Sequence, residues 1–442
     1  MCAPSNSGWG CTRSEFPPVN SACRLTFSDY ARLLRGNRNY RLLWLAQIVS
    51  ELGDWLYSVV IYGLLLDRTG NASAVATAVV LQVLPQVLIS PVAGVVNDRA
   101  RRRTVMIAAD VARFFIVLAM LWASHQPAVW PIYALLLVET LLWGFFEPGR
   151  SALLPNLTRG ERETLAANTL ASTTWSFNLA AGTALGGLLA VWLGRDIAFL
   201  INAFSFLVSA ALLLGIRIEE PHAAAGTPLK PADLVDFTPM MEGFRYIAGD
   251  RRLLATLLAK TGLGFMGANY IILTIMGERM FPVAESPLLG MSLLMFARGL
   301  GALLGPWIGG YWAGASPPRL RRGILYGFFA AAAGYIALSG APALGAAIAC
   351  VTLAHGGGSV IWVFSTTMLQ TQAEDRFRGR VFSADFAFLI VTMSLSAWLA
   401  GLAVDWGIPV RRVSLALGVL ILVPAALWWS RAIPLWRDDE DS

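Results

Sequence analysis

The sequence has little charge and very few histidines or cysteines. Only 14% of its 442 residues are Asp, Glu, Lys or Arg, whereas 56% are hydrophobic, and the mean hydropathy is +0.59. A soluble domain of this length needs far more charge to cover its surface. The shortage of charge therefore excludes a soluble globular protein and makes the lipid bilayer the expected solvent.

The residues that enzymes use most often are also scarce. The three histidines, His125, His222 and His355, are scattered over loops or a Gly-rich stretch. The sequence contains no metal-ligand pair, no nucleophile elbow and no phosphate-binding glycine loop with a lysine. We therefore expect no enzymatic activity, cofactor, metal ion or nucleic-acid partner. Without an ATP-binding motif, the energy for any transport must come from an ion gradient or from the substrate's own gradient.

Three of the four cysteines, Cys2, Cys11 and Cys23, lie in the first 38 residues. Their spacing matches no metal-site template. No apolar core precedes the charged patch RLTFSDYARLLRGNRNYR, so we expect no signal peptide. We expect residues 1–38 to form a disordered cytoplasmic tail without a disulfide, in which the part from Phe27 to Leu34 lies on the membrane surface.

Apolar runs are what the sequence has in abundance. Segments of about 18 to 25 residues recur along the chain, and each is long enough to cross roughly 30 Å of hydrocarbon as a helix. Lipid leaves helices as the only sensible structure for such runs, because every backbone group must be paired within the segment. The predicted spans are 40–66, 72–97, 104–124, 129–147, 163–193, 196–217, 253–279, 287–312, 321–340, 342–370, 378–404 and 411–431.

The basic residues orient these spans. With a cytoplasmic N-terminus, the cytoplasmic segments contain 26 of the 34 Lys and Arg residues and the other side contains 5. The remaining three, Arg113, Lys260 and Arg298, lie inside spans. This asymmetry follows the positive-inside rule. We expect both termini to be cytoplasmic and the protein to be a multi-pass protein of the inner (plasma) membrane.

The longest polar interval divides the spans into six and six. We expect a first bundle over 39–217, a cytoplasmic linker over 218–252, a second bundle over 253–432 and a short tail over 433–442. The piece from Leu234 to Ala248 has the spacing of an interfacial helix. The predicted fold is thus all-α, with two pseudo-symmetric six-helix bundles, a layout typical of transporters whose site lies between the halves near the bilayer midplane.

The stretch GVVNDRARRR, at 94–103, falls between the second and third spans. Its glycine, acid and arginines resemble the signature loop of the major facilitator superfamily, Gly-x-x-x-Asp-Arg-x-x-Arg-Arg. The matching residues are Gly94, Asp98, Arg99, Arg102 and Arg103. The spacing at this position in a twelve-span chain is specific, whereas an isolated D-R-x-x-R-R would be weak.

Other segments resemble one branch of that superfamily, the branch of drug–proton antiporters with the enterobactin exporter and the macrolide efflux proteins. They are SELGDW at 50–55, AADVAR at 108–113, EPGRSALLPNL at 147–157, AANTLAST at 166–173 and RGRVFS at 378–383. The resemblance covers residues 38 to 405. It implies export of an amphipathic small molecule of the drug, macrolide or siderophore type by alternating access.

The resemblance also implies a cytoplasmic gate around Asp98, which closes that side in the outward-facing state. Asp98 would sit near the N-terminus of the eleventh span, where unpaired backbone N–H groups favour an anion. Topology alone is the alternative, because short cytoplasmic loops gather arginine. The further gate candidates are Arg99, Arg102, Arg103, Arg150, Glu374, Asp375, Arg378 and Arg380, together with an Asp110–Arg113 ion pair and Asp385.

Charges within the spans are costly and point to function. Glu51 and Asp54 share a face of the first span roughly 17 to 21 Å along it, close to the midplane. Asp54 is the first candidate for a group that binds protons or substrate, because desolvation favours its protonated form. Glu139, in the middle of the fourth span, is the second candidate.

The second half contributes bases instead. Lys260 and Arg298 fall inside the seventh and eighth spans. A cavity with acids on one half and bases on the other could hold an amphipathic ligand while the acids carry protons. Alternatively, Arg298 pairs internally with Glu278 or with a backbone carbonyl.

Glycines indicate where helices approach each other closely. Gly301, Gly305 and Gly309 accompany Pro306, which permits tight packing and a kink. Gly182, Gly186 and Gly187 in AAGTALGG resemble the antiporter motif Gly-Pro-x-x-Gly-Gly, although Thr183 replaces its proline. That departure puts the export direction in doubt.

Two other functions remain open at this point. A lipid or lysophospholipid transporter could use the same fold, and so could a membrane sensor that transports nothing. The sequence does not name the substrate. We expect the partners to be an amphipathic small molecule, protons and the lipid bilayer, and the protein to be a monomer.

Overall fold

The computed structural model describes residues 26–220, 238–314 and 316–439, except the side chains at 161, 239, 375, 376 and 437–439. Within these ranges the chain is almost wholly helical, and twelve segments are long and apolar enough to cross a membrane. The predicted all-α fold with twelve spans is confirmed. The spans are α2 (Arg38–Thr69), α3 (Ala72–Val83) with α4 (Pro85–Arg99), α5 (Arg102–Ser124), α6 (Trp130–Leu157), α7 (Gly160–Leu193), α8 (Arg195–Leu214), α11 (Arg251–Leu263) with η3 (Gly264–Ala268) and α12 (Asn269–Arg279), α13 (Pro287–Ala313), α14 (Pro317–Ser339), α15 (Leu344–Gln372), α16 (Asp375–Asp405) and α17 (Val410–Leu427), which continues into η4 (Trp428–Ala432) and η5 (Ile433–Asp439).

Two spans predicted as single helices are interrupted. The second span breaks after Leu84, because Pro85 has no N–H to donate to the helix before it. The seventh span passes through the 3₁₀ turn η3. A Cβ added at Gly267 in this turn would lie only 2.1 Å from the carbonyl oxygen of Met393, so the break lets two backbones approach each other.

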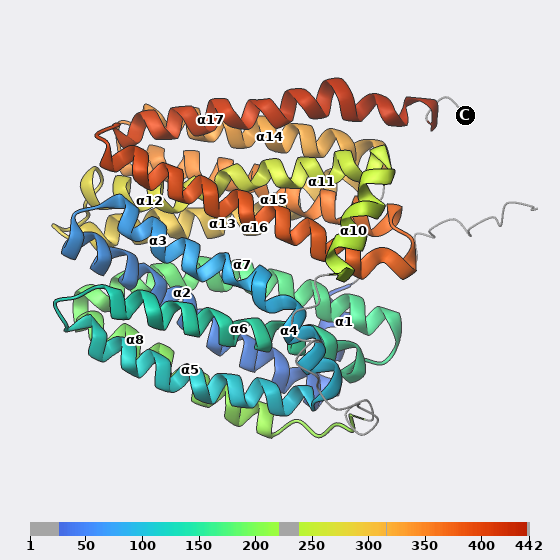
Figure 1. Ribbon diagram of the computed structural model, residues 1–442, viewed down its shortest axis with the longest axis horizontal. Helices are drawn as coiled ribbons and strands as arrows, with labels where there is room; N and C mark the ends of the chain where they lie inside the picture. The colour runs from blue at the N-terminus through green and yellow to red at the C-terminus, as the bar shows by residue number, and fades with distance from the viewer. Residues whose placement is uncertain (1–25, 221–237, 315, 440–442) are drawn as a thin grey trace, which may run out of the picture.

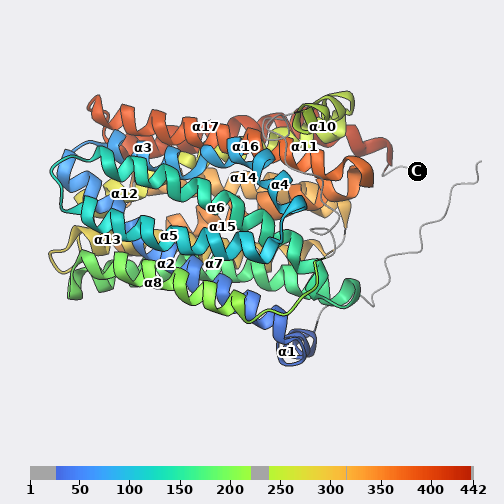
Figure 2. The ribbon, with the colours of Figure 1, turned by 60° about the horizontal axis from the view of Figure 1, so that its bottom comes forward.

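The spans follow the chain into two groups. Figure 1 shows α2 to α8 in the lower part of the molecule and α11 to α17 in the upper part, with α3 beside α16 between them. The helices α7 and α13 form a second contact between the two groups. We call the end at which α1 (Phe27–Gly36), α10 (Thr238–Gly249) and the C-terminus lie the basic end, and the other end the opposite end (Figures 1 and 2).

One buried apolar cluster joins the two halves toward the opposite end. It contains Leu64 and Val75 from the first half and Ile272 and Met291 from the second. In α2 its members begin only at Leu56, so this helix contributes to the cluster from its middle to the opposite end. The two halves therefore share a hydrophobic core at one end of the molecule.

The basic end has separate cores. One cluster contains Leu43, Met106 and Leu153 of the first half. Another contains Ile247 of α10 and Val381 of α16 in the second half. Each half is thus held together by its own apolar contacts where the basic loops lie, as expected of two units that can move relative to each other at that end.

Polar contacts reinforce the junction at the opposite end. The carboxylate of Asp405, at the end of α16, accepts hydrogen bonds from the backbone N–H groups of Ala72 (2.7 Å) and Ser73 (2.9 Å), which begin α3. The guanidinium of Arg279 donates to the carbonyl oxygen of Gly70 at 2.8 Å. These contacts join the first half to the second across the opposite end.

Two short helices lie at the basic end. The helix predicted between 234 and 248 is present as α10, and it packs against α16, where Phe244 stacks on Phe388 with ring centres 5.4 Å apart. Its predicted first residues and most of the linker, 221–237, lie outside the described residues. The predicted interfacial helix therefore also packs against the second group of spans, through α16.

The other short helix, α1, begins after Thr26 and packs on α7. Asp29 forms an ion pair with Arg162 at 2.9 Å and accepts hydrogen bonds from Thr26. The Arg162 guanidinium, together with these Thr26 hydrogen bonds, holds the pKa of the Asp29 carboxyl well below its usual range. The predicted surface segment is therefore a helix fixed to the first group of spans, while the tail cysteines Cys2, Cys11 and Cys23 lie outside the described residues.

Candidate functional site

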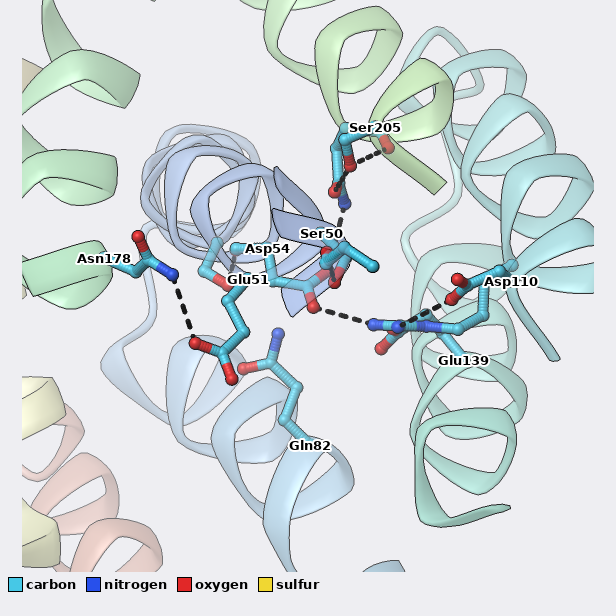
Figure 3. Close-up of polar contacts among 12 residues, drawn as sticks. Ser50, Glu51, Asp54, Gln82, Asp110, Glu139, Asn178 and Ser205 are labelled. Atoms are coloured by element: carbon cyan, nitrogen blue, oxygen red, sulfur yellow. Dashed lines mark hydrogen bonds and ion pairs between the residues drawn. The ribbon is translucent and has the colours of Figure 1, made fainter. Parts of the chain in front are cut away.

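The centre of the first half is a buried arginine surrounded by three acids (Figure 3). The Arg113 guanidinium of α5 lies 2.8 Å from the Asp54 carboxylate of α2 and 2.5 Å from the Glu139 carboxylate of α6. Asp110, one turn before Arg113, lies 3.9 Å away. The side chains of these four residues are 2%, 22%, 8% and 0% exposed, in that order, so Asp54 has the greatest access to solvent.

Neutral groups complete this cluster. The ring centre of Phe206 lies 4.0 Å from the Arg113 guanidinium carbon. The amide of Asn202, on α8, donates to Asp54 at 3.4 Å, and a Cβ on Gly53 would collide with that Asn202 side chain at 2.5 Å. The glycine therefore lets α2 and α8 approach closely enough for the Asn202–Asp54 contact.

The charges of this cluster do not balance. Three carboxyl groups face one guanidinium, so full ionisation would leave two negative charges without a cation among the four side chains. Buried charges are costly unless they are paired. The excess of carboxyl groups over cations makes this cluster a candidate site for protons or for a positively charged group.

The predicted Asp110–Arg113 ion pair is present as part of this cluster. Arg113 lies about 16 Å along α5 from its first residue, Arg102. From there its long side chain contacts Asp54 on α2 and Glu139 on α6. The i, i+3 spacing showed the Asp110 contact, but it could not show the shorter contacts of Arg113 with Asp54 and Glu139 on other helices.

Glu51 lies on the same face of α2, one turn before Asp54, and has a separate set of partners. It accepts hydrogen bonds from Gln47 at 2.9 Å and from Asn178 of α7 at 3.1 Å (Figure 3). Gln47 in turn accepts from Arg150 at 3.3 Å. Sequence analysis missed Gln47, although its i, i+4, i+7 spacing with Glu51 and Asp54 was a usable signal.

The predicted bases of the second half have different surroundings. Lys260 forms a buried ion pair with Asp385 at 2.6 Å and donates to Thr366 at 3.0 Å. The predicted gate residue Asp385 thus contacts Lys260 of the same half. Arg298 donates to the Tyr270 hydroxyl at 2.8 Å. This partner is neither Glu278 nor a backbone carbonyl, the two partners named in the predicted alternative.

The signature loop is shorter than the motif suggests. Gly94 to Arg99 still belong to α4, and only residues 100–101 separate it from α5. A Cβ on Gly94 would meet nothing within 4 Å. The Asp98 side chain is 74% exposed and pairs with Arg102 at 3.5 Å, so in this conformation Asp98 faces solvent.

Most arginines of the loop region bind carbonyl oxygens or nearby acids. Arg102 donates to Ala152 at 2.9 Å, and Arg103 donates to Leu213 at 2.9 Å. Among the other predicted gate residues, Arg150 pairs with Glu147 at 2.5 Å and Arg380 pairs with Glu242 at 2.9 Å. Interactions are also made by Arg99, Glu374 and Arg378. The Asp375 side chain lies outside the described residues. Arg150 and Arg380 thus bind within their own halves.

The predicted packing glycines allow close backbone contacts. A Cβ on Gly182 or Gly186 would lie within 2.9 Å or 2.3 Å of α2 carbonyl oxygens, and one on Gly187 would collide with Ser292 of α13 at 1.9 Å. Gly301 and Gly305 approach α15 in the same way, Gly309 faces Val360 at 3.0 Å, and Pro306 lies inside α13. The helix α7 is therefore clamped between α2 of its own half and α13 of the other.

Several curated proteins are similar in sequence to this chain over most of its length. It is 26% identical to the uncharacterised MFS-type transporter YfiS of Bacillus subtilis over 404 residues, 88% of this chain and 92% of the relative. It is 25% identical to macrolide efflux protein A of Streptococcus pyogenes (86% and 92%), and 23% identical to the putative bacilysin exporter BacE of Bacillus subtilis (81% and 87%).

Solved structures agree with the fold. A POT family transporter in complex with a thioalcohol-conjugated peptide superposes with a TM-score of 0.70 at 12% identity, covering 91% of this chain and 96% of the other. The nucleoside transporter NupG gives 0.68 at 13% identity, covering 89% and 99%. The model of the Major Facilitator Superfamily matches residues 43–388. The chain is a member of this superfamily, a multi-pass membrane transporter and not an enzyme.

Proposed function

We propose that the protein exports an amphipathic small molecule in exchange for protons, with its basic end in the cytoplasm. Two of its relatives are named for export, one of a macrolide and one of bacilysin. The excess of basic residues at one end supports the orientation. The absence of an ATP-binding motif in the sequence supports an ion gradient as the source of energy.

The observation that carries the proposal is the sharing of Arg113 by three carboxyl groups. An ion pair with one acid would be satisfied and static, whereas here Asp54, Glu139 and Asp110 compete for a single guanidinium. A proton on one acid releases the guanidinium to the others. Asp54 is the most exposed of the three, so we assign to it the exchange of protons with the space between the halves.

The distribution of apolar cores supports alternating access. For the site to open toward the opposite end, the halves must separate where they now share a core, and they must close at the basic end, where their cores are separate. A rocking motion of the two six-helix bundles makes both changes at once. Protonation of the Arg113 cluster would bias this motion because it changes the net charge of a buried site.

The test is transport in proteoliposomes with an imposed pH gradient, using a panel of amphipathic cations, macrolides, catecholates and aromatic carboxylates. Asp54→Asn and Glu139→Gln should lose gradient-driven flux, because neither variant side chain can carry the proton. Both variants should retain exchange of labelled for unlabelled substrate without a gradient. Asp196→Asn is the matched control, since that carboxyl is 54% exposed and lies outside the cluster.

Three results are informative. Flux lost in the cluster variants but kept in Asp196→Asn supports proton exchange through this site. Gradient-driven flux unchanged in both cluster variants would refute it. No flux of any compound by a folded wild-type protein would favour a lipid substrate or a sensor.

A further inference from the structure

Arg298 differs from the other two basic residues deep within the spans. Arg113 and Lys260 each contact carboxylates at 2.8 Å or less. Arg298 is 8% exposed, and its Nη2 donates to the neutral hydroxyl of Tyr270. Among the described residues its Nη1 has no hydrogen-bond partner. The structure therefore holds a buried guanidinium whose donors are only partly used.

Aromatic rings from both halves surround this guanidinium. Its carbon lies 4.2 Å from the ring centre of Tyr270 on α12 and 5.7 Å from that of Trp55 on α2. Trp55 meets Trp175 of α7 edge to face at 5.7 Å, and Trp175 is 41% exposed. Arg298 thus lies at the junction of the two halves, one aromatic pair away from an exposed surface.

The neighbouring polar groups do not replace the missing partner. The hydroxyl of Tyr335 and the Nε2 of His355 lie 2.9 Å apart and satisfy each other. Aromatic faces attract a guanidinium but accept none of its N–H groups in the way that an oxygen does. A buried cation without an anion is costly, so an occupant that brings an oxyanion would be strongly favoured.

We propose that Arg298 binds an anionic group of the transported molecule, specifically a carboxylate, while the flat apolar part of that molecule packs against Trp55 and Tyr270. A guanidinium offers parallel N–H groups that match the two oxygens of a carboxylate. The inference rests on the proposed function, because it assumes a carrier, and it narrows the substrate class to carboxylate-bearing aromatic compounds.

The charge of the first half agrees with this division of roles. The Arg113 cluster has more carboxyl groups than cations, so it repels an anion and suits protons. Lys260 is already neutralised by Asp385 at 2.6 Å. Arg298 is therefore the basic group of the membrane interior with binding capacity for an anionic substrate, and substrate and proton need not compete for one residue.

The experiment measures binding to the purified full-length protein in detergent, with naphthylacetate and its methyl ester as a matched pair of probes. The wild type should bind the acid about tenfold or more tightly than the ester, which corresponds to the strength of a charge-assisted hydrogen bond. Arg298→Gln should bind both alike, and Arg298→Lys should retain part of the preference. Arg411→Gln is the control, because Arg411 binds the carbonyl oxygens of Ser339 and Ala341 at the opposite end and should leave the preference unchanged.

Equal binding of acid and ester by the folded wild type, binding of neither probe, or a preference that survives in Arg298→Gln would each overturn the inference. If Arg298→Gln does not fold, the wild-type preference and the Arg298→Lys variant decide the question. Proton-driven flux with no preference for acids would refute this inference and leave the proposed function standing. Acid binding that depends on Arg298, without flux of any compound, would refute the proposed transport and leave the binding of a carboxylate at Arg298 standing.

Discussion

Asp405 provides the sharpest perturbation of the balance between the two conformations. The N-cap residue of α3, Asn71, makes no capping hydrogen bond with its side chain. The carboxylate of Asp405 takes that role from the other half of the molecule, accepting from Ala72 and Ser73. The cap therefore exists only while the opposite end is closed, and its removal should favour opening.

The size of the effect follows from the strength of helix caps. Loss of a capping side chain costs about 0.5–2 kcal/mol. Because the cap is absent in the open state, the whole cost falls on the closed state. Asp405→Ala should therefore lower the ratio of closed to open molecules by about 2- to 30-fold. Asp405→Asn, which keeps one acceptor oxygen but loses the charge, should have a smaller effect in the same direction.

Double electron–electron resonance between spin labels at the opposite end measures this ratio. Labels at positions 196 and 285, one in each half, report the separation in a background whose four cysteines are replaced by serine. Asp67→Ala is the control, because Asp67 pairs with Arg195 at the same end but within one half. An unchanged distance distribution in folded Asp405→Ala protein would refute the argument.

Three further predictions concern folding and can be measured in detergent. Gly186→Ala should lower the thermal unfolding midpoint, since overpacking costs about 1–3 kcal/mol and its Cβ would lie 2.3 Å from a backbone oxygen; Gly94→Ala, with open space around it, should not, and a lower midpoint there would contradict the packing argument. Asp385→Asn should destabilise by about 3–5 kcal/mol because Lys260 keeps a buried charge, and unfolding curves that match wild type would rule this out. The depressed pKa of Asp29 means that its contribution to the stability of α1 is complete at neutral pH and weakens progressively as the pH falls below about 3.9 toward that depressed pKa. Proteolysis of α1 should therefore become faster with increasing acidity, and a rate independent of pH in this range would contradict the argument.

Hydropathy was sufficient to place the spans, because crossing the bilayer requires a long apolar run whatever its neighbours are. It could not place the breaks at Leu84 and at η3. Pro85 was a usable sequence signal for the first break, whereas the break at Gly267 depends on the approach of a backbone 126 residues away, at Met393. The in-span acids Asp54 and Glu139 were found because charge in lipid is rare. Their union on Arg113 was missed because sequence spacing shows contacts within one helix, whereas this arginine bonds to two others.

The proposed gate at the basic end would use chemistry related to that of the opposite end, with the roles of two spans exchanged. At the opposite end, an acid that ends the eleventh span caps the helix that begins the second span. At the basic end, the motif would place Asp98, near the end of the second span, against the start of the eleventh span, yet here its side chain is 74% exposed. A carrier with both caps formed would be held closed at both ends, so one carboxylate has to lose its helix terminus when the other gains one. Such an exchange would offset the cost of breaking either cap, because a comparable interaction would form at the other end, and we propose that it keeps the two conformations close in free energy.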